Sequence, residues 1–290
     1  MSQHGELHQG PAVLLLCGDQ PSQWALAHRL TETGDLIGIV FSSNERVTSG
    51  NRHGGLGRLR RYALAPFNWP FRQAWVRLQD QYRGEYLFPP KVPTWRVPEV
   101  NDDLTVEVLT TTCPDLVLVS GTNLLNKRLI GIANDFSGMG TMNLHTGLSP
   151  YVRGGPNCTN WCLATGRPWL IGNTTMWIDE GIDSGDIIST ECTPMDGNES
   201  LLGLHRAVMD HAHDLVCRTV QTVGRGGQHR RPQSSFEDSG DLYYTRDWTA
   251  THMWQASRYI QSQYRLDVGS ELFSNMREEL ELVRLSKETR

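Results

Sequence analysis

The chain of 290 residues lacks a long apolar run. A helix needs roughly 20 consecutive apolar residues to cross a bilayer, and no segment approaches that length. The amino-terminal segment is polar, and its first apolar run is too short for a secretory signal. These absences predict a soluble, cytoplasmic protein that has no membrane partner.

Cysteine and histidine are present, but not in the patterns of metal centres. The six cysteines include no C-x-x-C pair, which is typical of reduced thiols in a cytosol. Cys158 and Cys162 stand four residues apart, but no second pair of ligands accompanies them at a suitable spacing. His211 and His213 cannot share one face of a helix, and with His205 they are expected on its polar face or at an interface. We therefore expect no metal site.

The chain also lacks an excess of positive charge. Its formal net charge is −5, whereas proteins that bind nucleic acids through phosphates usually carry a basic surface. A basic cluster of Arg52, Arg58, Arg60 and Arg61 could meet phosphates, but it also fits a solvated loop followed by a helix. The second interpretation is favoured, because these arginines follow no fixed spacing. A nucleic acid is not the expected partner.

The first 41 residues contain a strand-helix-strand pattern. Apolar runs at 12–17 and 36–41 predict buried strands, and residues 22–30, with Ser22 as N-cap, predict a helix between them. Such a compact unit forms a parallel pair of strands with a right-handed crossover. No G-x-G-x-x-G follows the first strand, which argues against a dinucleotide-binding dehydrogenase.

The same patterns continue along the chain. They predict an extended connector at 89–98, a helix capped by Asp102 or Asp103, strands at 115–119, 141–145 and 171–178, and a helix at 201–220. The fold expected from this order is α/β, with a Rossmann-like, mostly parallel sheet and flanking helices.

The composition changes near residue 224. A stretch rich in glycine, arginine and serine at 224–241 predicts a linker between a catalytic domain at 1–223 and a small C-terminal α+β appendage at 242–290. Within the appendage, residues 242–248 predict a strand and residues 249–260 a helix.

Residues 141–188 contain the side chains most suited to chemistry. Asn143 and His145 lie two residues apart in an expected strand, so both point to the same side of it. A later acidic turn can supply a carboxylate from Asp183 or Asp186. An amide, a titratable imidazole and a carboxylate together can orient a reactant and transfer a proton.

Four blocks in this stretch resemble the folate-dependent formyltransferase family. The blocks are NLH at 143–145, RG at 153–154, GNT at 172–174 and IDSGD at 182–186. The pattern is closest to the sugar-nucleotide N-formyltransferases, although Gly147 stands where the family has serine and Ser149 where it has leucine. The resemblance implies the formyltransferase fold and transfer of a formyl group from N10-formyltetrahydrofolate to a primary amine, without a metal.

The resemblance assigns roles to individual residues. It implies that Asn143, His145 and Asp183 are catalytic, with Asp186 as the alternative carboxylate. It places Asn123, Leu124 and Leu125 against the folate, although these letters also fit an ordinary strand-to-helix loop.

The remaining site residues follow from the same resemblance. Asp179 and Ile182 are further expected folate contacts. Tyr151, Arg153 and Gly154 are expected to bind the substrate, Tyr151 by stacking on a base and Arg153 by orienting an acidic group or by capping its turn.

The acceptor is not determined by these motifs. A nucleotide-linked amino sugar is the favoured small-molecule amine, and hydroxyornithine, glycinamide ribonucleotide and methionyl-tRNA are the alternatives. A hydrolase of formyltetrahydrofolate or a folate sensor remains a further alternative. The C-terminal appendage is expected to contribute to a homodimer contact or to the rim of the substrate site.

Overall fold

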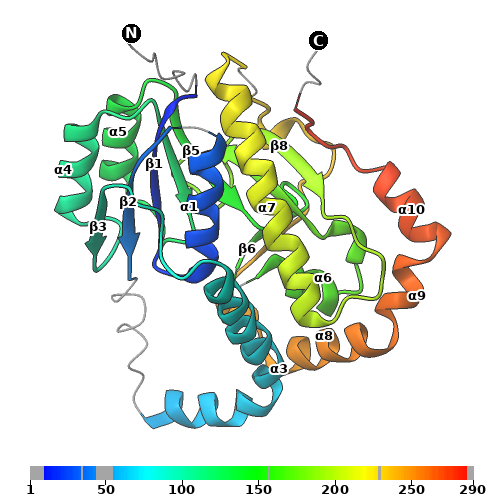
Figure 1. Ribbon diagram of the computed structural model, residues 1–290. Helices are drawn as coiled ribbons and strands as arrows, with labels where there is room; N and C mark the ends of the chain where they lie inside the picture. Colours follow the sequence, from blue (N-terminus) through cyan, green and yellow to red (C-terminus); the bar gives the residue numbers. More distant parts are fainter. Residues whose placement is uncertain (1–9, 34, 44–54, 156, 228–229, 286–290) are drawn as a thin grey trace.

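The computed structural model describes residues 10–33, 35–43, 55–155, 157–227 and 230–285. A seven-stranded sheet forms its centre in the order β3-β2-β1-β4-β5-β7-β8 (Figure 1). Its strands are β1 (Ala12–Gly18), β2 (Asp35–Ser42), β3 (Thr94–Val97), β4 (Leu116–Ser120), β5 (Gly140–His145), β7 (Gly172–Trp177) and β8 (Ile187–Cys192). Strands β1 to β5 are parallel, and β7 and β8 are antiparallel to their neighbours. The expected mostly parallel α/β fold is confirmed.

Helices cover both faces of the sheet. Leu15 of β1 belongs to a core formed with α1 (Pro21–Thr33) and α7 (Leu201–Gly224). Leu14 belongs to the opposite core, formed with α4 (Asp103–Thr112) and α5 (Lys127–Phe136). Because both faces are covered, the central strands are apolar without alternation, as in other parallel sheets.

Several expected element boundaries change. The N-cap of α4 is Asp102, whose side chain accepts a hydrogen bond from the Leu104 N–H at 3.0 Å. Ser22 lies inside α1, which begins one residue earlier. The connector at 89–98 contains β3, an edge strand paired with β2, which the surrounding prolines concealed.

Two of the three α7 histidines are not on a polar face. His205 and His213 are buried, and burial lowers the pKa of His205 to about 4 and that of His213 to about 3. His205 Nε2 lies 3.0 Å from Asn160 Oδ1. His211 Nε2 lies 3.1 Å from Glu191 Oε2. The polar-face alternative is wrong for His205 and His213, because this long helix packs against the rest of the protein along more than one side.

The long helix α3 (Gly55–Glu85) follows residues outside the described part of the chain. It contains Pro66 and Pro70, and residues 65–70 are exposed. The side chains of the predicted basic cluster, Arg52, Arg58, Arg60 and Arg61, lie outside the described residues.

The C-terminal helices pack against α6 (Cys158–Ala164). The helices α8 (Ala250–Ser262), α9 (Tyr264–Val268) and α10 (Glu271–Glu278) form a third core with α6 (Figure 1). The strand expected at 242–248 is shorter, because β9 (Asp241–Tyr243) is followed by a 3-10 turn. Strand β9 pairs in parallel with β6 (Val152–Gly154). The division into a catalytic domain, a linker and an appendage stays a prediction.

No helix among the described residues combines the length and the apolar character that crossing a membrane would require.

Candidate active site

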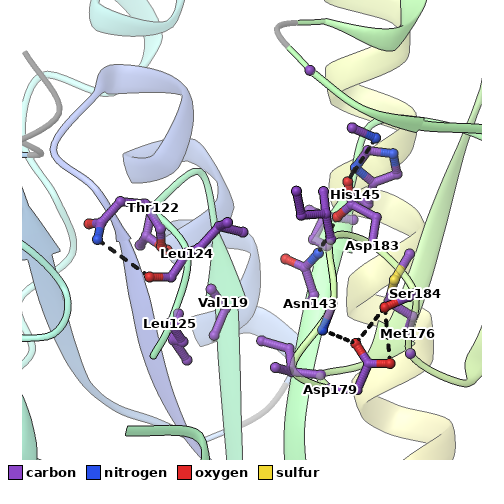
Figure 2. A pocket seen from close by; sticks show the side chains of 18 of the residues that line it. Val119, Thr122, Leu124, Leu125, Asn143, His145, Met176, Asp179, Asp183 and Ser184 are labelled. Atoms are coloured by element: carbon purple, nitrogen blue, oxygen red, sulfur yellow. Dashed lines mark hydrogen bonds and ion pairs between the residues drawn. The ribbon is translucent and has the colours of Figure 1, made fainter. Parts of the chain in front are cut away.

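A cavity of about 820 Å³ opens at the carboxyl ends of β4 and β5 (Figure 2). Ligands of open α/β sheets bind in this region of the fold. The first wall is β5 with the acidic segment 179–185, the second comes from the C-terminal part of the chain, and the third is the loop after β4. The residues that line the cavity include Val119, Asn123, Leu124, Leu125, Ile130, Asn143, His145, Cys158, Met176, Ile178, Asp179, Ile182, Asp183, Ser184, Tyr243, Tyr244 and Thr245.

Strand β5 delivers the amide and the imidazole to the cavity. Asn143 and His145 occupy alternate positions near the end of this strand, so both side chains reach the same side, and Figure 2 shows them along one wall. The side chain of His145 is only 11% exposed. The predicted pair is therefore brought together.

Asp183 joins this pair from the acidic turn. Its carboxylate accepts a hydrogen bond from Asn143 Nδ2 at 3.3 Å and another from the Gly154 N–H at 3.0 Å. Its Oδ2 also lies 3.4 Å from His145 Nδ1. Three groups from residues 143–154 thus converge on a carboxylate that comes 29 to 40 residues later, whereas Asp186 does not line the cavity.

The backbone of Asp183 adopts an unusual conformation. Its φ of +48° lies in the left-handed region, which costs a residue other than glycine about 1 kcal/mol or more. The turn is also tight at Gly185, where a Cβ would lie 1.8 Å from the Trp177 carbonyl oxygen. Neighbouring groups must therefore hold this turn in place.

Gln233 provides that support. Its buried amide donates hydrogen bonds to the carbonyl oxygens of Asp183, at 2.8 Å, and Gly185, at 2.9 Å. The residue lies in the 3-10 turn Gln233–Ser235, inside the stretch expected to be a linker. Sequence reasoning missed it, because no local pattern links this glutamine to carbonyl groups 48 and 50 residues away.

The residues expected to contact folate do line the cavity. Leu124 and Leu125 face Asp179 across it in Figure 2, and Asn123 and Ile182 complete this set. The Asp179 carboxylate accepts hydrogen bonds from the Gly181 N–H and from the Ser184 hydroxyl, which fixes the acidic loop. That these five residues bind folate stays a prediction.

Only one of the three expected substrate-binding residues lines the cavity. Gly154 does, and its φ of +86° and its close approach to the Tyr243 carbonyl oxygen leave no room for a side chain. The structure does not bring Tyr151 there, because its buried hydroxyl is hydrogen-bonded to the backbone of Glu281. Nor does it bring Arg153, which donates to the Ser239 carbonyl oxygen at 3.3 Å.

Different aromatic residues reach the cavity. The ring of Tyr243 stacks on Trp161 at 4.2 Å between centroids, which anchors the second wall to α6. The next residue, Tyr244, is 36% exposed, and the guanidinium of Arg246 lies 4.6 Å from the centre of its ring. Tyr243 ends β9 and Tyr244 follows it, and the pairing of β9 with β6 brings them beside Gly154.

The histidine has a second neighbour, the thiol of Cys158. Its Sγ lies 3.5 Å from His145 Nε2. Burial raises the pKa of this thiol well above its usual range, and Cys162 and Asp183 add to the effect. Cys158 is therefore a neutral thiol at physiological pH. The sequence pattern drew attention to it only through its spacing from Cys162, and did not indicate a contact with His145.

Across the described residues, no three histidine, cysteine, aspartate or glutamate side chains gather in a way that could hold a metal ion.

Comparison with known proteins agrees with the geometry. Residues 77–220 match the family model described as formyl transferase. This segment belongs to the formyl transferase family. This match includes Asn143, His145 and Asp183, but ends before Gln233 and Tyr244.

Curated members of the family include the methionyl-tRNA formyltransferases. That of Syntrophus aciditrophicus is 32% identical over 171 residues, which are 56% of this chain and 52% of that protein. That of Geotalea uraniireducens is 33% identical over 166 residues, which are 52% of this chain and 50% of that protein. The chain thus spans about half the length of the curated relatives it matches.

Solved structures of other formyltransferases share the fold. A sugar N-formyltransferase from Shewanella matches with a TM-score of 0.53 and 13% identity, over 84% of this chain and 87% of that one. A phosphoribosylglycinamide formyltransferase from Anaplasma phagocytophilum matches with a TM-score of 0.51 and 16% identity, over 81% of this chain and 99% of that one. At these identities the likeness establishes the fold alone.

Proposed function

We propose that this formyltransferase moves a formyl group from N10-formyltetrahydrofolate to a primary amine, with Asn143, His145 and Asp183 as its catalytic residues. The observation that carries the proposal is their convergence: the carboxylate of Asp183 contacts both other side chains at one wall of the cavity.

The cavity has the character that a folate requires. Its volume of about 820 Å³ lies within the range typical of small-molecule sites. Apolar side chains can cover a flat heterocycle, and the acidic loop presents backbone groups for hydrogen bonds to its edge. The apolar residues are Val119, Leu124, Leu125, Ile130, Met176 and Ile178. When bound, the folate would supply the formyl group and accept a proton on its departing nitrogen.

Asn143 has the role of holding the formyl oxygen. Its amide can donate a hydrogen bond to that oxygen as negative charge develops, and loss of one such donor costs about 3 kcal/mol of barrier in comparable sites. Because β5 fixes the backbone and Asp183 accepts from Nδ2, this amide is oriented before the reactants bind.

His145 and Asp183 act as a proton-handling pair. The carboxylate lies at hydrogen-bonding distance from Nδ1, which favours a proton on that nitrogen and leaves Nε2 as the nitrogen that can exchange a proton with the reactants. The carboxylate also stabilises the imidazolium when the ring gains a second proton.

For the acceptor, we propose an amino sugar carried on a nucleotide. The support is the second wall, where the exposed ring of Tyr244 lies beside the guanidinium of Arg246. Aromatic faces stack on bases, and guanidinium groups pair with phosphates. A homodimer through the C-terminal helices stays a prediction, which sedimentation would test.

A second candidate acceptor is methionyl-tRNA. The observation in its favour is that the curated relatives at 32% and 33% identity are methionyl-tRNA formyltransferases. The overall charge of −5 does not favour an RNA partner, since phosphate contacts dominate such binding.

Release of tetrahydrofolate from N10-formyltetrahydrofolate tests these proposals. The assay compares aminodeoxy-sugar nucleotides, glycinamide ribonucleotide, hydroxyornithine, charged initiator tRNA and no amine. Turnover that depends on a sugar nucleotide supports the main proposal, and turnover that depends on tRNA supports the second. Release without any amine would identify a hydrolase. Absence of release with all of them would overturn the proposed transfer to these classes of amine.

A further inference from the structure

The imidazole of His145 is held from both sides. Its Nδ1 faces the Asp183 carboxylate at 3.4 Å, and its Nε2 faces Cys158 Sγ at 3.5 Å. Cys158 begins α6 and is 2% exposed, so its position is fixed by packing. Both ring nitrogens therefore have a neighbour within the protein.

Gly147 makes this arrangement possible. A Cβ at this position would lie 2.3 Å from His145 Nε2 and 2.7 Å from Cys158 Sγ. A separation under 3.0 Å forces a shift, and here the atoms in the way belong to the imidazole and to a buried thiol. The backbone φ of Gly147 is not in the left-handed region, so the glycine is required by space and not by backbone strain. A side chain at 147 would therefore displace His145 or Cys158.

The thiol is suited to follow the protonation of the ring. A neutral thiol is both a weak donor and a weak acceptor. It can donate to Nε2 when the ring is neutral and accept from the Nε2–H when the ring is charged. Its other neighbours, the carbonyl oxygens of Gly154 at 3.5 Å and Val152 at 3.8 Å, can take the S–H in the second case.

We propose that Cys158 is a positioning residue for His145. Its sulfur fixes the plane of the imidazole, so that Nδ1 keeps its contact with the Asp183 carboxylate. Because a thiol is a weak hydrogen-bond partner, Nε2 can exchange this contact for a hydrogen bond to the reacting groups. The proposal rests on the function proposed above, and it adds a residue that lies outside the four blocks of the family pattern.

Three variants separate hydrogen bonding from packing. Cys158→Val fills the space without a polar atom, Cys158→Ala leaves a small cavity, and Cys158→Ser restores a donor and acceptor. We expect kcat to fall about 3- to 10-fold in Cys158→Val, with the KM for the folate and the urea midpoint close to those of the unmodified chain. Cys158→Ser should recover part of the lost kcat.

A spectroscopic readout accompanies the kinetics. The imidazole nitrogen signals of His145, assigned by comparison with His145→Gln, should change in Cys158→Val and return toward their original positions in Cys158→Ser. Unchanged kcat and unchanged His145 signals in Cys158→Val would overturn the proposal. So would a formyl adduct on Cys158 found by mass spectrometry during turnover, because the thiol would then be a nucleophile.

The two proposals can fail separately. The nitrogen signals are measured on the free protein and require no turnover, so they test the Cys158–His145 contact even where no amine is formylated. A chain that shows the expected signals but transfers no formyl group would retain the positioning contact and lose the proposed function.

Discussion

The first and second walls of the cavity differ in how their polar side chains are held. At the first, formed by β5 and the acidic turn, His145 and Asp183 are largely buried. Their polar atoms contact each other, the Gly154 N–H and Cys158 Sγ. At the second, formed by residues 243–245, Tyr244 is 36% exposed, and the nearby Arg246 side chain is 77% exposed. The first wall is preorganised, whereas side chains of the second can still rearrange around a ligand.

This difference fits a division between chemistry and recognition. Preorganised donors need no rearrangement while charge develops, which is where a site gains most of its rate. An exposed aromatic ring with an arginine can adapt to a larger molecule at modest energetic cost. We therefore expect changes at the first wall to affect kcat, and changes at the second to affect KM.

The largest effects are expected from Asn143→Ala and His145→Ala. Each removes a group that faces the reacting atoms, so kcat should fall about 100- to 1000-fold. Folate affinity, measured by calorimetry, should change little, because the apolar walls remain. Retention of more than a tenth of the original kcat by either variant would show that these residues are not the catalytic pair.

The next effect concerns the choice of carboxylate. Asp183→Asn removes the negative charge beside His145 Nδ1 and should lower kcat on the order of tenfold to 100-fold. Asp186→Asn is the matched control, because Asp186 lies in the same turn outside the cavity. Should the Asp186 variant prove the less active of the two, the assignment of the carboxylate is wrong.

Gln233→Ala tests the support behind the first wall. The change removes two hydrogen bonds to the buried turn and should lower the free energy of unfolding by about 2 kcal/mol. It should also lower kcat several-fold, because Asp183 loses support for its left-handed backbone. The exposed neighbour Ser234 provides the control, as Ser234→Ala. Equal urea midpoints and equal kcat for the two variants would rule out this role.

The buried residue His213 on α7 does not line the cavity, and its effect is expected on the stability of the fold. In the described structure neither ring nitrogen of His213 has a hydrogen-bond partner, and burial lowers its pKa to about 3. The folded protein thus keeps His213 neutral, while the unfolded chain binds a proton below about pH 6.5. Stability should be lost as the pH falls from about 6.5 toward 3, by about 1.4 kcal/mol per pH unit.

The variant His213→Leu checks this prediction. Between pH 7.5 and pH 5, its free energy of unfolding should fall by about 2 kcal/mol less than that of the unmodified chain. Urea titrations at the two pH values measure this difference. An identical pH dependence in the two proteins would mean that His213 is protonated in the folded state.

The smallest effect is expected at the second wall. Tyr244→Ala removes an exposed ring and should raise the KM for the acceptor a few-fold, which corresponds to about 1 kcal/mol of stacking. The KM for the folate should not change. If kcat falls while the acceptor KM stays constant, the two walls do not divide the work as described.

The first wall could be predicted from the sequence, because its signals are local. Asn143 and His145 share a strand face through their spacing, and the acidic turn around Asp183 has a recognisable pattern. The apolar runs likewise revealed the covered sheet. The order of strands and the pairing of β6 with β9 depend on contacts between distant segments, which no local pattern specifies.

The second wall and the support behind the first wall could not be predicted for the same reason. Tyr244 reaches the cavity only because β9 pairs beside Gly154. The amide of Gln233 meets a turn 48 to 50 residues earlier. Conversely, Tyr151 has an aromatic ring that could stack on a base, and it lies next to the substrate-binding motif in the sequence. Tertiary packing instead places its hydroxyl in hydrogen bonds with the backbone of Glu281.

A crystal structure with a folate that carries a non-transferable formyl group would test the central claim most directly. We predict that the formyl oxygen lies within hydrogen-bonding distance of Asn143 Nδ2 and that His145 Nε2 faces the reacting carbon. The pteridine ring should lie between Leu124 and the loop at 179–182. A folate bound in this cavity with its formyl group turned away from Asn143 and His145, or bound elsewhere on the protein, would contradict the account.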